Sequence, residues 1–175
     1  MYSGVVMSEK QDVTALQTAI TRLQQVKSLI LSTVDEQGLP QASYAPFVEY
    51  DSCLYVLLSG LALHTQNLLK QKRANVMLIE DEALARNIFA RARLNYSVSV
   101  AVVEKDTSPG VEVLTAMKDK LGNTVDVLAD LPDFMLFQLK LEKARLVIGF
   151  GRAYVFVPGE VDGAIQLTEK NSLQA

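Results

Sequence analysis

Apolar side chains occupy alternate positions between residues 94 and 102, and this pattern constrains the fold more than any other feature of the chain. The apolar positions are Leu94, Tyr96, Val98, Val100 and Val102. Successive side chains of a β-strand point to opposite faces, so this spacing predicts a strand with one face against a core. We expect that strand to extend from Phe89 to Val103.

Other segments with strong local preferences predict further strands and a few helices. Residues rich in strand formers lie at 29–34, 41–49, 53–58, 75–79, 134–141 and 145–156. Apolar spacing and polar connecting sequence predict helices at 12–26, 63–71 and 110–128, the last interrupted at Gly122. This order of elements indicates a mainly β fold, an antiparallel barrel with flanking helices packed on it.

Length and composition favour one compact domain. The chain has 175 residues, and 49% of them are hydrophobic, which is enough for a core without disulfides. We expect the domain to span residues 1–157, including the N-terminal helix, and a more polar tail to follow at 158–175. The single cysteine, Cys53, excludes an intrachain disulfide and fits a reducing compartment.

Charge and hydropathy argue against two classes of partner. The formal net charge of -3 gives no basic field, so we do not expect nucleic-acid binding. No run approaches the ~20 apolar residues of a membrane span, and the first residues lack the features of a signal peptide. We therefore expect a cytoplasmic protein without a membrane partner.

The stretch from Ser59 to Asn67 is the first place to look for a chemical site. It contains His64, the single histidine of the chain, together with Thr65. Imidazole titrates near neutral pH and binds metals, and the free amides at the start of the expected helix favour anions. The alternative is that Ser59 or Thr65 only caps the helix and that His64 has no task.

Two arginines supply candidate positive charge. Arg91 and Arg93 are two residues apart on the expected strand, so both guanidinium groups would point to one face and could bind one anionic ligand. The alternative is an ordinary solvated face. Tyr44 could line an apolar wall of the same site.

Two further motifs have mainly structural interpretations. Asp133 follows Pro132 at the start of an apolar strand, where a carboxylate most often ends a turn or caps backbone amides. Gly149-Phe150-Gly151 lies within an expected strand and suggests a bulge rather than a phosphate-binding loop. No residue pattern identifies a metal site or a catalytic residue.

Four segments carry a resemblance to a known family. They are Ser43–Phe47, Met77–Glu82, Phe89–Arg91 and Asp133–Phe137. From about residue 29 to 154, the chain resembles the haem-utilisation (HugZ/HutZ-like) proteins, within the FMN-binding split-barrel superfamily that includes pyridoxamine 5'-phosphate oxidase. The resemblance implies a split β-barrel homodimer with a groove for haem or FMN between its subunits. The cofactor-binding candidates are then Tyr44, Ser59, His64, Thr65, Asn67, Arg91, Arg93 and Asp133.

The chain departs from its relatives at two places. Pyridoxamine-phosphate oxidases hold the flavin phosphate with an Arg-Lys pair, where this chain has His64-Thr65. Haem-degrading members take an axial ligand from a histidine in the C-terminal tail, and residues 166–175 contain none. Asp133 matches the acidic residue that supports that ligand. Three hypotheses follow: a haem-binding or haem-handling protein, an FMN-dependent oxidoreductase, and a non-catalytic cofactor-binding module.

Overall fold

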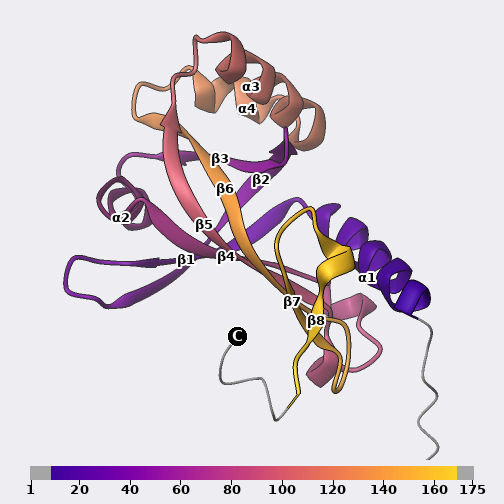
Figure 1. Cartoon of the computed structure of the whole chain (residues 1–175). Coiled ribbons are helices and arrows are strands. Elements are labelled where there is room, and N and C mark those ends of the chain that lie inside the picture. Colours follow the sequence, from indigo (N-terminus) through magenta and orange to yellow (C-terminus); the bar gives the residue numbers. More distant parts are fainter. Residues whose placement is uncertain (1–8, 169–175) are drawn as a thin grey trace, which may run out of the picture.

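A six-stranded antiparallel barrel forms the centre of the molecule (Figure 1). We describe residues 9–168 from a computed structural model. The strands pair in the order β3-β2-β1-β4-β5-β6, and pairing of β6 with β3 closes the ring. The barrel strands are β1 (Ser28–Val34), β2 (Pro40–Tyr50), β3 (Cys53–Ser59), β4 (Arg73–Ile79), β5 (Arg93–Val103) and β6 (Phe134–Val147). The expectation of a mainly β antiparallel barrel is confirmed.

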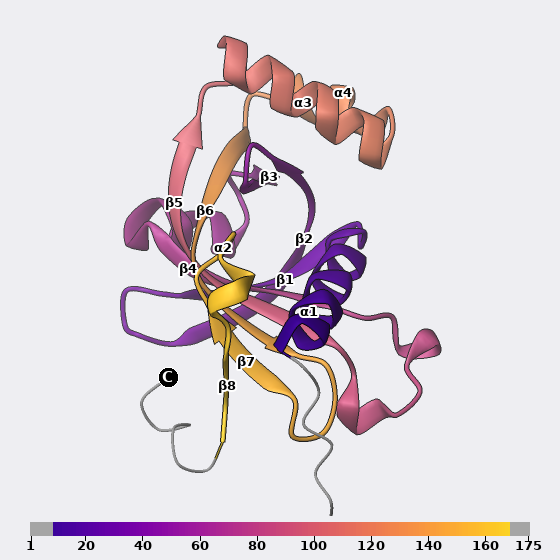
Figure 2. The same cartoon turned by 45° about the vertical axis from the view of Figure 1, so that its right-hand side comes forward.

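Helices cover parts of the barrel. The α-helices are α1 (Glu9–Gln24), α2 (Leu63–Gln71), α3 (Ser108–Leu121) and α4 (Thr124–Ala129), and the short 3-10 helices are η1 (Glu82–Leu84), η2 (Ile88–Ala90) and η3 (Val161–Gly163). Figures 1 and 2 show α3 and α4 together at one end of the barrel, beside β3. There Val113 and Met117 pack with Val48, Tyr55 and Leu57 in a second apolar cluster. No helix within residues 9–168 is long and apolar enough to cross a membrane.

The alternation in β5 divides its side chains between the core and the surface. Leu94, Tyr96 and Val98 are almost fully buried, and Val100 is 9% exposed. Val102 breaks the expected pattern, because it lies at the end of the strand and is 45% exposed. The intervening polar side chains therefore face outward, on the side of the sheet opposite the core.

The long strand begins later than its sequence pattern predicts. Phe89 lies in η2 and is exposed, and β5 starts at Arg93. The side chain of Asn87 accepts a hydrogen bond from the Phe89 amide at 3.0 Å, which caps this short helix. Local capping thus replaces strand pairing over the first four residues of the expected strand.

The sequence pattern predicts two separate strands at 134–141 and 145–156, and this prediction is wrong. β6 is continuous over Phe134–Val147, and a register shift opposite Ser97 and Val98 leaves Glu142 as an extra residue. The chain turns instead at residues 148–152, where Gly149 and Gly151 have φ angles of 153° and 65°. Gly149-Phe150-Gly151 is therefore a hairpin turn, and these glycines supply the positive φ that the turn requires.

The sheet continues beyond the barrel toward the C-terminus. β7 (Ala153–Phe156) pairs with the second half of β6, and β8 (Ile165–Gln166) pairs with β7. Residues 158–168, expected as the start of a polar tail, thus carry η3 and an edge strand. The end of that tail, residues 169–175, lies outside the described residues.

Candidate functional site

Ser59 and Asp133 meet where β3 ends and β6 begins. The Ser59 hydroxyl donates a hydrogen bond to Asp133 Oδ2 at 2.7 Å, and the Gly60 amide donates to the Asp133 carbonyl oxygen at 2.6 Å. A Cβ atom at Gly60 would lie 3.1 Å from that oxygen, so glycine permits the close approach. We call Ser59, Gly60, Asp133 and the adjacent His64 the β3–α2 junction.

Thr65 and Asn67 hold α2 in place rather than face a ligand. Thr65 Oγ1 donates to the Ser59 carbonyl oxygen at 2.7 Å, and Asn67 Nδ2 donates to Thr33 Oγ1 at 3.0 Å. Thr65 is 0% exposed and Asn67 is 4% exposed, so neither side chain can reach a bound molecule in this arrangement. That both residues line one ligand wall stays a prediction, and within the subunit their polar groups bond to Ser59 and Thr33.

His64 is half-buried and has one ring nitrogen engaged. Nδ1 lies 3.0 Å from Ser43 Oγ, and the Ser43 hydroxyl donates to the Leu31 carbonyl oxygen at 3.4 Å. In this arrangement Nδ1 donates to Ser43, and Nε2 keeps its lone pair. Burial lowers the pKa of His64 below its ordinary value of 6.5, which favours the neutral imidazole that can bind a metal.

Apolar side chains remain exposed around the β3–α2 junction. Leu61 is 89% exposed, and Leu63 and Leu131 are also exposed. Tyr44 is also exposed, but it follows Ser43 on β2, so its side chain points to the face of the strand opposite the one that contacts His64. Large exposed apolar side chains close together are typical of a surface that contacts an apolar ligand or another protein.

The two arginines do not act as the pair that their spacing predicts. Arg91 precedes β5, and its guanidinium donates to the Glu80 carbonyl oxygen and forms an ion pair with Glu82 at 3.3 Å. Arg93 is the first residue of β5, and its Nη1 donates to the Arg91 carbonyl oxygen at 3.0 Å. Arg91 is thus occupied by its own subunit, whereas Arg93 lies on the outer face of the sheet.

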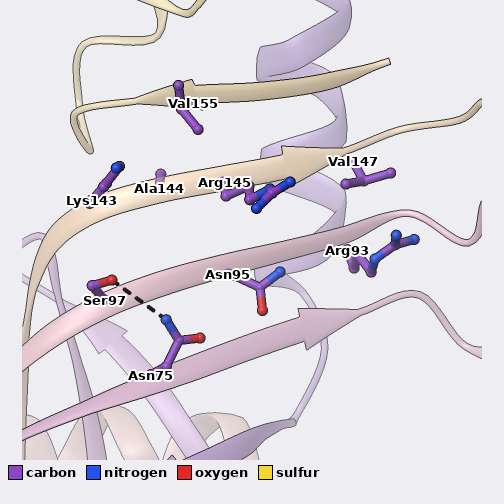
Figure 3. Close-up of a pocket in the computed structure, with 9 residues that line it drawn as sticks. All are labelled: Asn75, Arg93, Asn95, Ser97, Lys143, Ala144, Arg145, Val147 and Val155. Carbon is purple, nitrogen blue, oxygen red and sulfur yellow. Dashed lines mark hydrogen bonds between the residues drawn. The ribbon is translucent and has the colours of Figure 1, made fainter. Parts of the chain in front are cut away.

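Arg93 shares a hollow with two cations that the sequence did not single out. Figure 3 shows Arg93 on β5 near Arg145 on β6, with Lys143 farther along β6 toward the other end of the hollow. The hollow has a volume of about 450 Å³. We call it the basic hollow; its polar lining consists of Arg93, Lys143, Arg145, Asn75, Asn95 and Ser97. Lys143 and Arg145 alternate with the buried Ala144, and this pattern indicates that both cations leave one face of a strand. The strand register is needed to place them beside β5.

The site candidates therefore form two groups. Among residues 9–168, no hydrogen bond or ion pair joins the β3–α2 junction to the basic hollow. That same part of the chain contains no group of three or more His, Cys, Asp or Glu residues that could hold a metal ion. His64 carries the single imidazole of the sequence.

Comparisons with known proteins agree with this architecture. Residues 16–148 match the family model for pyridoxamine 5'-phosphate oxidase. Haem oxygenase HutZ of Vibrio cholerae is 43% identical over 131 residues, covering 75% of this chain and 74% of HutZ.

Solved structures show the same likeness. The crystal structure of Vibrio cholerae HutZ, described as a haem storage protein, superimposes with a TM-score of 0.70 at 39% identity, covering 82% of this chain and 95% of that one. Campylobacter jejuni ChuZ shares the fold, with a TM-score of 0.81 at 24% identity over 91% of this chain and 65% of its own. The chain therefore belongs to the pyridoxamine 5'-phosphate oxidase family of split barrels, in the branch that includes HutZ.

Proposed function

We propose that this protein binds haem for haem-iron utilisation, in a groove between the two subunits of a homodimer. The observation that carries the proposal is the environment of His64. Its ring is half-buried, its Nδ1 is held by Ser43, and the exposed Leu61 and Leu63 precede it along the chain. A neutral, oriented imidazole beside exposed apolar side chains suits an iron porphyrin. The 43% identity to a haem oxygenase supports the same ligand class.

The residues present fit haem. His64 Nε2 would hold the iron, and Leu61 and Leu63 would contact the apolar macrocycle. Redox chemistry, where it occurs, would come from the bound iron porphyrin, and the chain would supply position and electrostatics. Ser59 and Asp133 would fix the turn that precedes α2, the helix of His64, since they join the end of β3 to the start of β6.

A homodimer explains why the candidates fall into two groups. The β3–α2 junction and the basic hollow are not in contact within one subunit, but two-fold symmetry can place the junction of one subunit beside the hollow of its partner. We expect an apolar interface larger than about 2,000 Å², typical of an obligate dimer. A monomer at micromolar concentration in sedimentation would contradict this arrangement. We further propose a cytoplasmic location, which the lone Cys53 fits.

Family membership keeps FMN as the second candidate ligand. The resemblance to pyridoxamine-phosphate oxidases implies a flavin-phosphate site at His64 and Thr65, where those enzymes have an Arg-Lys pair, and here Thr65 is fully buried. This substitution removes two cations from the expected phosphate site, so we expect FMN to bind more weakly than haem.

Absorbance spectra of purified protein titrated with haemin and with FMN test the proposal. We expect haemin to produce a saturable Soret band, and His64→Ala to weaken binding and shift that band. A Soret band with unchanged position and affinity in His64→Ala would show that His64 does not hold the iron. Tight binding of FMN with no saturable binding of haemin would overturn the proposal in favour of a flavoprotein.

A further inference from the structure

We propose that the basic hollow binds the carboxylate groups of the haem ligand, with Lys143 and Arg145 as the main contacts. This inference rests on the proposed function, because it names the part of the surface that recognises the acidic edge of the ligand. The observations that carry it are strand register, unneutralised charge and neighbouring hydrogen-bond donors.

Strand register brings the three cations together on one face. Arg145 is paired with Asn95, Lys143 with Ser97, and Arg93 with Val147. Arg93 and Arg145 are therefore diagonal neighbours, whose separation is about 7–8 Å in an antiparallel pair. Lys143 is two residues from Arg145 on the same strand, so both side chains leave the same face of β6 (Figure 3).

No opposite charge pairs with the cations of the hollow within the described part of the chain. Neither Arg93, Lys143 nor Arg145 forms an ion pair with any residue between 9 and 168. No aspartate or glutamate lines the hollow. Glu142, although adjacent in sequence, lines a neighbouring hollow together with Arg73. Arg145 lies between Arg93 and Lys143, so it is repelled by both like charges, and an anionic ligand would relieve that repulsion.

Neutral donors lie beside these cations. Asn75 Nδ2 donates to Ser97 Oγ at 3.5 Å, which leaves the Ser97 hydroxyl hydrogen available. The side chain of Asn95, between Arg93 and Ser97 on β5, makes no hydrogen bond to another residue in the range 9–168. Charged and neutral donors on one face match the several acceptor oxygens of carboxylates. Phosphate offers similar oxygens, so the test must separate the two sources.

The experiment compares haemin with haemin dimethyl ester, in which iron and macrocycle are unchanged and both carboxylates are blocked. The variants are Lys143→Ala, Arg145→Ala and the double substitution. Loss of charge-assisted bonds predicts at least about a tenfold loss of haemin affinity in the double variant. We expect little change in its affinity for the ester. Lys140→Ala is the matched control, because Lys140 is an exposed lysine of β6 outside the hollow.

The outcomes separate this inference from the proposed function. Failure of the wild type to bind haemin would refute the proposed function itself. Haemin binding that the double substitution leaves unchanged would overturn only this inference, as would equal losses for haemin and its ester. FMN is titrated into the same proteins, and a loss confined to FMN would assign the hollow to phosphate and overturn the carboxylate assignment.

Discussion

Replacing Thr33 with valine should destabilise the protein by loosening α2, the helix that carries His64. The Thr33 hydroxyl accepts a hydrogen bond from Asn67 Nδ2 at 3.0 Å, and the two residues are 1% and 4% exposed. Valine has nearly the shape of threonine but no hydroxyl, so the Asn67 amide would stay buried without its partner. An unsatisfied buried polar group costs about 1–3 kcal/mol, and we expect the free energy of unfolding of Thr33→Val to fall by that amount.

A double-mutant cycle isolates the hydrogen bond from other effects of the substitution. In Thr33→Val/Asn67→Leu both polar partners become apolar, and such paired replacement is often nearly neutral. The double variant should therefore be more stable than the sum of the single variants predicts, by at least about 1 kcal/mol.

Urea unfolding followed by circular dichroism measures each variant. Thr115→Val is the control, because Thr115 is exposed on α3 and surface substitutions usually change stability by less than about 0.5 kcal/mol. A Thr33→Val protein as stable as this control would refute the reasoning. Strict additivity in the cycle would also refute it, because Thr33 and Asn67 would then not be coupled.

Three further predictions follow from the same structure. Gly110→Ala would place a Cβ 2.1 Å from the Glu104 carbonyl oxygen, so we expect it to lose about 1–3 kcal/mol in urea unfolding while Gly163→Ala, with no atom within 4 Å, changes little. Burial lowers the pKa of His64 in the folded protein below 6.5, so as the pH falls through 6.5 the unfolded chain takes up the imidazole proton more readily than the folded protein does. The free energy of unfolding of the wild type should therefore fall between pH 7.5 and 5.5, and that of His64→Gln should fall less. Urea unfolding midpoints at the two pH values measure the difference. Haemin bound with ascorbate and oxygen should release little iron, because residues 166–175 contain no histidine; rapid loss of the Soret band with iron release in wild type and His64→Ala would contradict this.

Local sequence patterns predict the elements of this fold well where neighbours along the chain decide them. The spacing of Leu16, Ile20 and Leu23 identifies α1, and all three are buried. The same reasoning fails at Phe89, because Asn87 caps a short helix that the alternation of apolar residues does not reveal. It also fails at Glu142, where a bulge interrupts the apolar pattern without ending β6.

The candidate site is less predictable because its parts come together through register. Arg91 and Arg93 look equivalent in the sequence, yet contacts with Glu80 and Glu82 occupy Arg91 and leave Arg93 facing the hollow. Lys143 lies in the basic hollow because the bulge at Glu142 sets the pairing of Lys143 with Ser97. A one-residue change in that register would move Lys143 and Arg145 to the opposite face, which shows why periodicity alone cannot assign them.

Asp133 illustrates how a residue can be located from sequence while its role depends on its partners. One carboxylate oxygen accepts the Ser59 hydroxyl, and within residues 9–168 no other side chain is hydrogen-bonded to that carboxylate. This bond gives Asp133 a structural use within the subunit, because it joins the end of β3 to the start of β6. The second carboxylate oxygen still has acceptor capacity, so the same aspartate can join β3 to β6 and accept a bond from a ligand or a partner subunit. Structural and binding roles are therefore compatible at Asp133. Substitution of Ser59 removes the bond between β3 and β6 but keeps the Asp133 carboxylate, so it separates the structural role from the binding role.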